Sequence, residues 1–385
     1  MRERKARAAL VNAIVVVVTT AVASCVEPAP VVESVVPACK RRALPSGVVG
    51  ANVIDRDDAS DHDPTNDDAR GYGSDASRRV LDRLVSIGLD AVALPIPVHA
   101  TDQRATSVRA GRLLDVKGRA RLARTIDDAH ERGLAVVVVP HLTLDDGTWR
   151  GEMAPRAPLR SDEAATRAFL TSYGDVVVEL ARVAESRCVE MFSFAVEFKS
   201  LTRDARFVDD LDALAARVRA SFTGTLTYSA NWDEAKDALG WSRVDVISVN
   251  AFAPLAHDAS ADDAALAEGA RTFQSELFAL ALREDRPVWM MEAGFKATRG
   301  SFVEPWRWPA EVAHEKPARD DETQARAYRA LIAAARENTA LAGVLFWAVP
   351  SDLDDAAHPA RFEPEWGFSF LGKSAESVVK EFAAQ

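Results

Sequence analysis

The chain of 385 residues is poor in cysteine and histidine, and this scarcity limits its chemistry. Three cysteines cannot build a disulfide framework or a four-cysteine zinc site, and the seven histidines form no HExxH motif. Glycine and proline, 19 and 18 residues, are too few for a collagen-like or largely disordered chain. A formal net charge of −11 argues against nucleic acid as a partner.

Apolar sequence, by contrast, is plentiful. Hydrophobic residues make up 48% of the chain and charged residues 27%, which is enough apolar material for a large buried core. The length allows two or three domains, although a single α/β barrel often exceeds the usual domain size. The composition therefore predicts an acidic globular protein, either an enzyme or a binding module.

The first 24 residues differ from the rest of the chain. A cationic start is followed by about fifteen apolar residues, fewer than a membrane span needs and typical of a secretory signal. The run ends in VASC, which resembles the bacterial lipobox, where cleavage precedes the cysteine and its thiol receives a diacylglycerol. We therefore expect a lipoprotein signal peptide at 1–24, a lipid on Cys25 and an exported protein anchored to a membrane of the bacterial cell envelope. The alternative is an uncleaved anchor with an incidental cysteine.

The remainder of the chain divides into a tether and one large domain. Residues 25–46 carry four prolines and no helical period, which predicts a semi-rigid tether. From residue 47 to residue 385, short β-rich apolar runs alternate with longer amphipathic segments. The runs lie at 48–54, 91–99, 135–142, 191–198, 225–232, 244–252, 287–295 and 341–349.

Eight such runs separated by helical stretches predict parallel strands with helices as crossovers, and therefore an α/β (β/α)₈ TIM barrel over 47–385. The helical period is clear at 77–88, 120–133 and 209–222. A doubly wound open sheet is the alternative, but it usually has a glycine-rich phosphate loop after its first strand. The GxGxxA sequence at 71–76 follows the acidic segment 55–68 instead of a strand, so we interpret Ser74 or Asp75 as a helix cap.

A TIM barrel carries its chemistry at the carboxyl ends of its strands, and two of the predicted strands end in glutamate. Glu197 ends the fourth strand and Glu292 ends the seventh. Strand alternation places bulky residues, among them Val196 and Trp289, on the opposite faces, so both glutamates are expected to point to the barrel axis. Two carboxylates across one mouth are the pair that glycoside hydrolysis needs. The alternative is an ion pair with a base such as Lys199 or Lys296.

Other barrel chemistries fit the strand ends less well. The first strand has no HxH for a metal, and His99 and His141 lack a third nitrogen or sulfur ligand, so we predict no metal and no cofactor. No GxSxG motif occurs, and the segments after the last two strands do not resemble phosphate loops.

In order along the chain, VVVVPHLTLDDGTWRGEM, MFSFAVEFKSLT, GTLTYSANWDE, VNAFAPL, VWMMEAGFKA and LFWAV resemble glycoside hydrolase family 113, the endo-β-1,4-mannanases, over roughly residues 47–382. The resemblance implies that Glu197 is the acid/base and Glu292 the nucleophile of a retaining mechanism. It also implies a sugar cleft lined by His141, Trp149, Arg150, Asn231, Trp232, Asn250 and Trp347.

The chain departs from the family at two positions beside these glutamates. Val196 stands where the family usually has a small polar residue, and Phe252 stands where a tyrosine typically donates a hydrogen bond to the nucleophile. Losing that bond slows catalysis by roughly ten- to a hundredfold. We expect a lipid-anchored retaining hydrolase of β-1,4-mannan or a related β-linked polysaccharide. The alternative is a weakened or inactive glycan-binding surface lipoprotein on the same barrel.

Two further pairs of residues stay open at this point. Cys39 and Cys188 each precede a strand, so both should lie at the amino-terminal rim of the barrel, where the sequence permits a disulfide without requiring one. Trp306 and Trp308 follow the seventh strand and are either sugar platforms or packing under a long loop.

Overall fold

The computed structural model describes residues 39–55, 71–156, 161–307, 317–352 and 366–384. The expected signal peptide, Cys25 and all but the last residues of the tether lie outside these ranges, as do Trp308 and most of the acidic segment. Among the described residues, no helix combines the length and apolar character that crossing a membrane would require.

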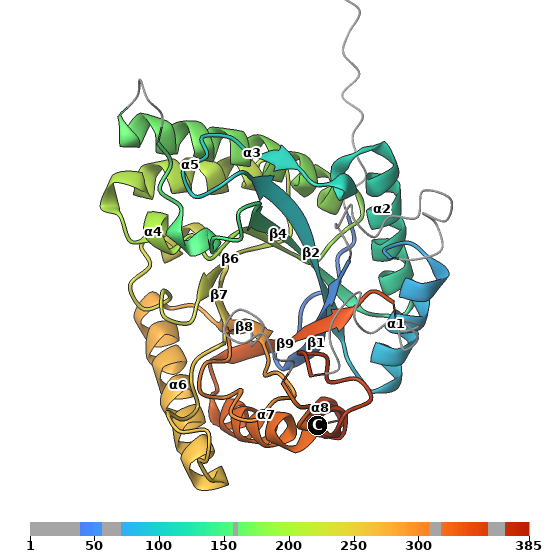
Figure 1. Ribbon diagram of the computed structural model, residues 1–385. Coiled ribbons are helices and arrows are strands. Elements are labelled where there is room, and N and C mark those ends of the chain that lie inside the picture. Colours follow the sequence, from blue (N-terminus) through green and yellow to red (C-terminus); the bar gives the residue numbers. More distant parts are fainter. Residues whose placement is uncertain (1–38, 56–70, 157–160, 308–316, 353–365, 385) are drawn as a thin grey trace, which may run out of the picture. The chain divides into compact units, whose positions relative to one another are not determined.

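Eight parallel strands close into a barrel, as Figure 1 shows in a view along its axis. The strand order is β1-β9-β8-β7-β6-β5-β4-β2, and pairing of β1 with β2 closes the ring; β3 is a short antiparallel addition to β2. The strands are β1 Val48–Ile54, β2 Ala91–Ala100, β3 Arg109–Ala110, β4 Ala135–Leu144, β5 Met191–Val196, β6 Thr225–Asn231, β7 Val246–Asn250, β8 Val288–Ala293 and β9 Leu341–Pro350. The predicted TIM barrel is confirmed, and each of the eight predicted runs contains or overlaps a barrel strand.

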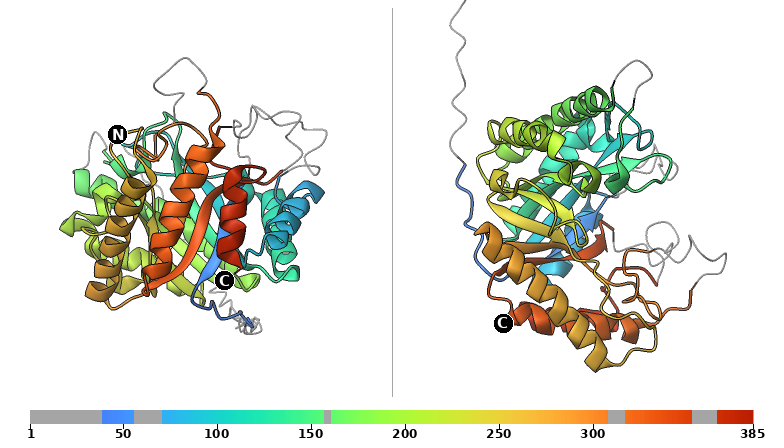
Figure 2. Two further views of the ribbon diagram at one scale, coloured as in Figure 1. Left: turned by 90° about the horizontal axis from the view of Figure 1, so that it is seen from below. Right: turned by 90° about the vertical axis from the view of Figure 1, so that its left-hand side faces the viewer.

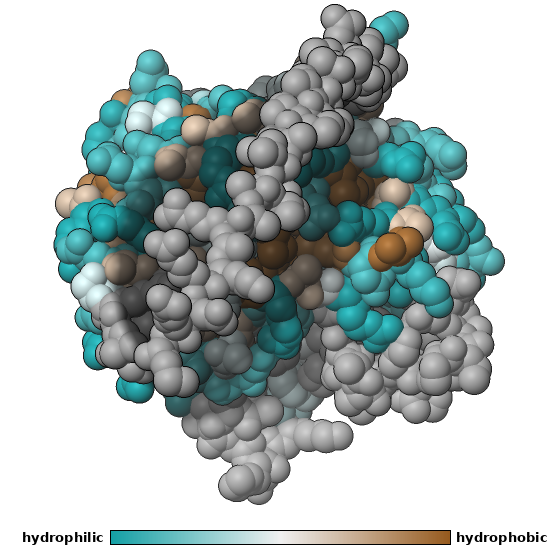
Figure 3. Space-filling model, turned by 90° about the horizontal axis from the view of Figure 1, so that it is seen from above, coloured by the Kyte–Doolittle hydropathy of each residue, from teal (hydrophilic) through white to brown (hydrophobic). Residues whose placement is uncertain are grey.

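Helices surround the barrel on its outer face (Figures 1 and 2). They are α1 Asp75–Ser86, α2 Val116–Glu131, α3 Asp162–Ser186, α4 Lys199–Thr202, α5 Val208–Arg219, α6 Asp263–Glu284, α7 Asp321–Glu337 and α8 Ser374–Ala383, with short 3₁₀ turns at Arg112–Leu114, Arg150–Glu152, Ala205–Phe207 and Trp241–Arg243. Ser74 is the N-cap of α1, and its side chain accepts a hydrogen bond from the Ser77 amide, so the GxGxxA sequence starts a helix as expected. Hydrophilic residues form most of the described surface in Figure 3.

Buried side chains form two clusters, one between the strands and the helices and a smaller one inside the barrel. The inner cluster draws its buried members from strands only, and it includes Val196, Trp289 and Met291. Simple alternation had placed Val196 and Trp289 on the faces away from the axis, and that prediction is wrong. The reason is irregular pairing, because the register shifts between Ser193 and Val196 on β5 and again near the end of β8.

The amino-terminal rim of the barrel is fastened by a disulfide. Cys39 and Cys188 are bonded, with their Cα atoms 5.2 Å apart, in the usual range for such a bridge. The segment after Cys39 then runs along this rim, where the Arg41 guanidinium donates to the Val189 carbonyl and Leu44 packs against the inner cluster. The disulfide that the sequence left open is therefore present.

Because the bridge closes a loop of 149 residues, its removal should release much chain entropy to the unfolded state. We predict that the Cys39→Ser, Cys188→Ser double variant loses about 2–4 kcal/mol of unfolding free energy, measured by denaturant titration. Reductant should destabilise the native protein to a similar extent and leave the double variant unchanged. Equal stability of the oxidised protein and the double variant would contradict this account.

Candidate active site

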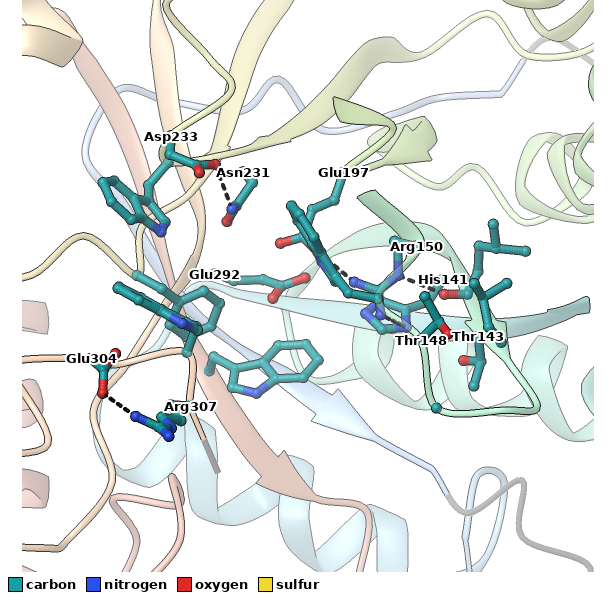
Figure 4. A pocket seen from close by; sticks show the side chains of 18 of the residues that line it. His141, Thr143, Thr148, Arg150, Glu197, Asn231, Asp233, Glu292, Glu304 and Arg307 are labelled. Atoms are coloured by element: carbon teal, nitrogen blue, oxygen red, sulfur yellow. Dashed lines mark hydrogen bonds and ion pairs between the residues drawn. The ribbon is translucent and has the colours of Figure 1, made fainter. Parts of the chain in front are cut away.

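A cavity of about 760 Å³ lies at the carboxyl ends of the strands, and both strand-end glutamates line it. Six of the seven residues expected to bind sugar also line it: His141, Trp149, Arg150, Asn231, Trp232 and Trp347. Asn250 does not line the cavity but reaches Glu197 from the end of β7. Figure 4 shows the carboxyl groups of Glu197 and Glu292 directed into the same space.

Glu197 reaches the cavity through a backbone turn. β5 ends at Val196, and Glu197 has a left-handed φ of 53°, which is uncommon for a residue with a side chain. Its amide donates to the Ser229 carbonyl at 2.8 Å, and the next amide, of Phe198, donates to the Tyr228 hydroxyl at 2.7 Å. The turn therefore rests on two hydrogen bonds to β6.

Three donors converge on the Glu197 carboxylate. The Arg150 guanidinium and the Trp149 indole donate to Oε2 at 2.6 and 2.8 Å, and the Asn250 amide donates to Oε1 at 2.9 Å. These bonds and the charge of Arg150 stabilise the ionised carboxylate. An ion pair was the alternative weighed for each glutamate, and Glu197 does form one, although with Arg150 instead of the lysines considered.

The two lysines have other partners. Lys199 pairs with Asp233 beside the cavity and lies over the Trp149 ring, while Lys296 is buried and donates to the Pro305 carbonyl. Arg150 is the base that pairs with Glu197, and its charge also acts on Glu292.

Arg150 is itself fixed from three sides. Its Nε donates to the Leu142 carbonyl at 2.6 Å, and its Nη2 lies 3.0 Å from His141 Nδ1. Burial and the charge of Arg150 hold the pKa of His141 well below its ordinary value, so the imidazole is neutral and Nδ1 can accept this bond. The His141 ring stacks on Trp347 with centroids 5.9 Å apart. The neutral histidine thus keeps the guanidinium aimed at Glu197.

Glu292 has a different environment from Glu197. It is 3% exposed, and among the described residues its Oε1 has no hydrogen-bond partner. Burial, and then the negative charge of Glu197, raise its pKa well above the ordinary carboxyl value, while Arg150 and the Asn250 amide oppose the shift. Burial thus opposes the ionisation that the role of nucleophile requires of Glu292.

Four tryptophans enclose the cavity. Trp149 and Trp347 flank the glutamates, and Trp232 stacks on Trp306 with centroids 5.4 Å apart. Trp306 is 44% exposed although large and apolar, which favours a sugar platform over packing under a loop. Asp233 also lines the cavity, and it accepts a hydrogen bond from the side-chain amide of Asn231 at 2.9 Å. The sequence analysis overlooked this residue, although its position directly after Trp232 could have indicated it.

The described residues assemble no group of three potential metal ligands from histidine, cysteine, aspartate and glutamate. His99 lies 3.7 Å from Asp145, whereas His141 contacts Arg150, so the two histidines have separate partners. That the protein needs neither a metal nor a cofactor stays a prediction.

Comparison with known families and structures identifies this arrangement. Residues 66–373 match the profile of Glycoside Hydrolase Family 113. The chain belongs to glycoside hydrolase family 113. The match covers most of the barrel, and it confirms both the predicted family and the prediction that the protein is a glycoside hydrolase.

Solved structures of this family share the fold. A family 113 β-mannanase from Alicyclobacillus acidocaldarius is 24% identical, with a TM-score of 0.71 over 89% of this chain and 98% of that one. A second family 113 β-1,4-mannanase is 21% identical, also at 0.71, over 88% and 99%. A β-glucuronidase from Faecalibacterium prausnitzii is 14% identical, with a TM-score of 0.54 over 89% of this chain and 49% of its own. The search of curated proteins found no match.

Within this family 113 hydrolase, the two departures from the family pattern lie at different depths. Val196 is fully buried in the inner cluster beneath the cavity, whereas the Phe252 ring lines the cavity and packs edge-on against Phe368. A phenylalanine ring offers no donor, and the unpartnered Oε1 of Glu292 agrees with the loss of a tyrosine hydroxyl there.

The burial of Glu292 makes a prediction about stability. Because its native pKa is raised, the native state binds this proton more tightly than the unfolded state does, and stability falls as pH rises from the ordinary carboxyl pKa towards the raised one. An unsatisfied buried group costs about 1–3 kcal/mol, so Glu292→Gln should unfold at a higher temperature than wild type at pH 8. The difference should shrink towards pH 4.5. A less stable Glu292→Gln at both pH values would contradict the prediction.

Proposed function

We propose that the protein hydrolyses β-1,4-mannan or a closely related β-linked polysaccharide with retention of configuration. The observation that carries this proposal is the pair of buried glutamates facing one cavity among four tryptophans. The solved family 113 structures named above are β-mannanases, which favours mannan as the substrate. A neutral polymer also suits an acidic protein, since negative charge repels acidic glycans.

In the proposed mechanism the two glutamates have different roles. The Glu292 carboxylate attacks the anomeric carbon as the glycosidic bond breaks, and Glu197 gives its proton to the leaving oxygen. In the second step Glu197 takes a proton from water, the water oxygen bonds to the anomeric carbon, and the bond to Glu292 breaks. Each glutamate therefore returns to its starting state, and the two inversions together retain configuration.

The resting site must rearrange before this chemistry can begin. At rest, Arg150 pairs with Glu197 and burial raises the pKa of Glu292, but catalysis needs a proton on Glu197 and an ionised Glu292. We infer that the pair shares one proton and that bound sugar, by drawing the Arg150 guanidinium or the Trp149 indole away from Glu197, lets the proton pass from Glu292 to Glu197. Because the groups are coupled, activity should depend on pH through the pair and not through either glutamate alone.

Export and anchoring are also part of the proposal. The expected signal peptide and a lipid on Cys25 would attach the protein to a membrane through its amino terminus. Cys39 is bonded at the amino-terminal rim of the barrel, and the cavity opens at the carboxyl ends of the strands. The expected tether would therefore join the barrel domain at the rim opposite the cavity.

One observation supports a second candidate, a glycan-binding protein with little activity. The acid/base glutamate is occupied by an ion pair with Arg150, and the Phe252 ring has no donor for Glu292, whose Oε1 is unpartnered among the described residues. On that account sugars would bind among the tryptophans without being cleaved.

Product analysis on mannohexaose distinguishes the two candidates. We predict that protein lacking residues 1–24 releases shorter mannosides, and that Glu197→Gln and Glu292→Gln each lower kcat by more than about a thousandfold, the order expected when a catalytic group is removed. The same product analysis on cellulose, xylan and chitin oligosaccharides shows whether cleavage is specific to mannosides. Measurable binding of mannohexaose with no cleavage of any glycan would favour the binding protein.

Restoring the missing hydroxyl should accelerate the enzyme. We predict that Phe252→Tyr raises kcat by about tenfold, the value of one charge-assisted hydrogen bond used in the transition state, because a phenol beside Glu292 would stabilise its carboxylate. The measurement is steady-state kinetics on mannohexaose. In a Glu292→Gln background the same substitution should give no increase, and no gain over wild type would argue that the phenylalanine is not the cause of a slow reaction.

A further inference from the structure

A third glutamate, Glu234, lies completely buried next to the cavity, and the mechanism above gives it no role. It follows the cavity residues Asn231, Trp232 and Asp233 but does not itself line the cavity. A fully buried carboxyl is costly unless it is hydrogen-bonded, so its contacts indicate what it does.

The Glu234 carboxylate joins two segments that meet at the cavity. Its Oε1 accepts from the Tyr228 hydroxyl and from the Thr202 hydroxyl, the latter at 2.5 Å. Its Oε2 accepts from the backbone amide of Asn231 at 3.0 Å. One oxygen therefore contacts β6 and α4, and the other fixes the start of the segment that carries Asn231 and Asp233.

The contact with Tyr228 leads directly to the acid/base glutamate. The Tyr228 hydroxyl accepts from the Phe198 amide, so its own hydrogen is available to an acceptor, and Glu234 supplies that acceptor. Phe198 directly follows Glu197, whose left-handed backbone must be held by its surroundings. Through one tyrosine, Glu234 thus stabilises the turn that aims Glu197 into the cavity.

The contact with Asn231 leads to the other side of the same carboxylate. The Asn231 side chain binds Asp233, Asp233 pairs with Lys199, and Lys199 lies over the ring of Trp149. Trp149 in turn donates to Glu197. The chain of contacts that starts at Glu234 therefore returns to Glu197 from the opposite direction.

We propose that Glu234 is a positioning residue, a buried carboxylate that fixes both the Glu197 turn and the Asn231–Asp233 segment of the sugar cleft. The inference rests on the proposed function, because it concerns the same site. It requires the carboxylate to accept on both oxygens, which a glutamine cannot do, since its amide has only one oxygen and its NH₂ group would oppose one set of donors.

At Glu234, burial disfavours the ionised carboxylate that this role needs, and the hydrogen bonds of the carboxylate oppose that effect. Burial raises its pKa from an ordinary 4.5 to about 7, with the charge of Glu197 adding to the shift and hydrogen bonds from Thr202, Tyr228 and Asn231 opposing it. Of the charged groups on the adjoining segments, Lys199 pairs with Asp233, and Arg203 pairs with Asp237. Since the native pKa is raised, the ionised carboxylate lowers stability as pH rises from about 4.5 to about 7.

Kinetics of two variants test the proposal. Tyr228→Phe breaks only the link to the Glu197 turn, so it should lower kcat by about tenfold with KM changed less than about twofold. Glu234→Gln disturbs both segments, so it should lower kcat by at least as much and also raise KM. Glu190→Gln is the matched control: it removes another buried glutamate, which binds the Val136 amide and His130 at the amino-terminal end of β4, and should keep kcat and KM within about twofold.

Two measurements that need no hydrolysis separate this proposal from the proposed function. Calorimetric binding of mannohexaose to Glu292→Gln should weaken when Glu234→Gln is added and stay unchanged when Tyr228→Phe is added. Thermal melts should show Glu234→Gln gaining stability relative to wild type between pH 5 and pH 8.

A wild type that cleaves no glycan would overturn the function alone. Wild-type kinetics and binding for Glu234→Gln, or equal losses for Glu234→Gln and Glu190→Gln, would overturn the positioning role.

Discussion

One negative charge shared between two carboxyl groups governs the structure of this site. Glu197 receives an ion pair and two further hydrogen bonds, while Glu292 is buried beside it with one oxygen unpartnered among the described residues. Two ionised carboxylates in this space would repel each other, and a single guanidinium can neutralise only one of them. The raised pKa of Glu292 favours a proton on that carboxyl, and acid catalysis needs one proton on the pair.

The rest of the mouth keeps this arrangement in place. Neutral His141 holds Arg150, Arg150 holds Glu197, and the left-handed turn at Glu197 is held by β6. These contacts join residues far apart in the sequence, and the closed barrel is what brings them together. The cost of burying Glu292 is expected where stability is given up for activity.

The fold was predictable because it depends on patterns that repeat along the chain. Eight apolar runs with the β pattern and the helical periods between them determine a barrel with little regard to any single residue. The positions of Glu197 and Glu292 at strand ends were predictable for the same reason. The faces of their neighbours Val196 and Trp289 were not, because irregular pairing on β5 and β8 shifts the alternation, and no residue type in the sequence marks those shifts. The electrostatic roles were also beyond the sequence, since they depend on which glutamate Arg150 reaches.

The central claim is that Glu292, although it favours the proton at rest, becomes the nucleophile once sugar is bound. Mass spectrometry of the protein after incubation with a 2-deoxy-2-fluoro-mannosyl fluoride tests it most directly. The 2-fluorine slows both formation and release of the glycosyl-enzyme, whereas the good fluoride leaving group speeds formation alone, so the intermediate accumulates. The account predicts a single adduct on the peptide that contains Glu292. An adduct on the peptide that contains Glu197 would show that the two glutamates have exchanged roles and would contradict the account.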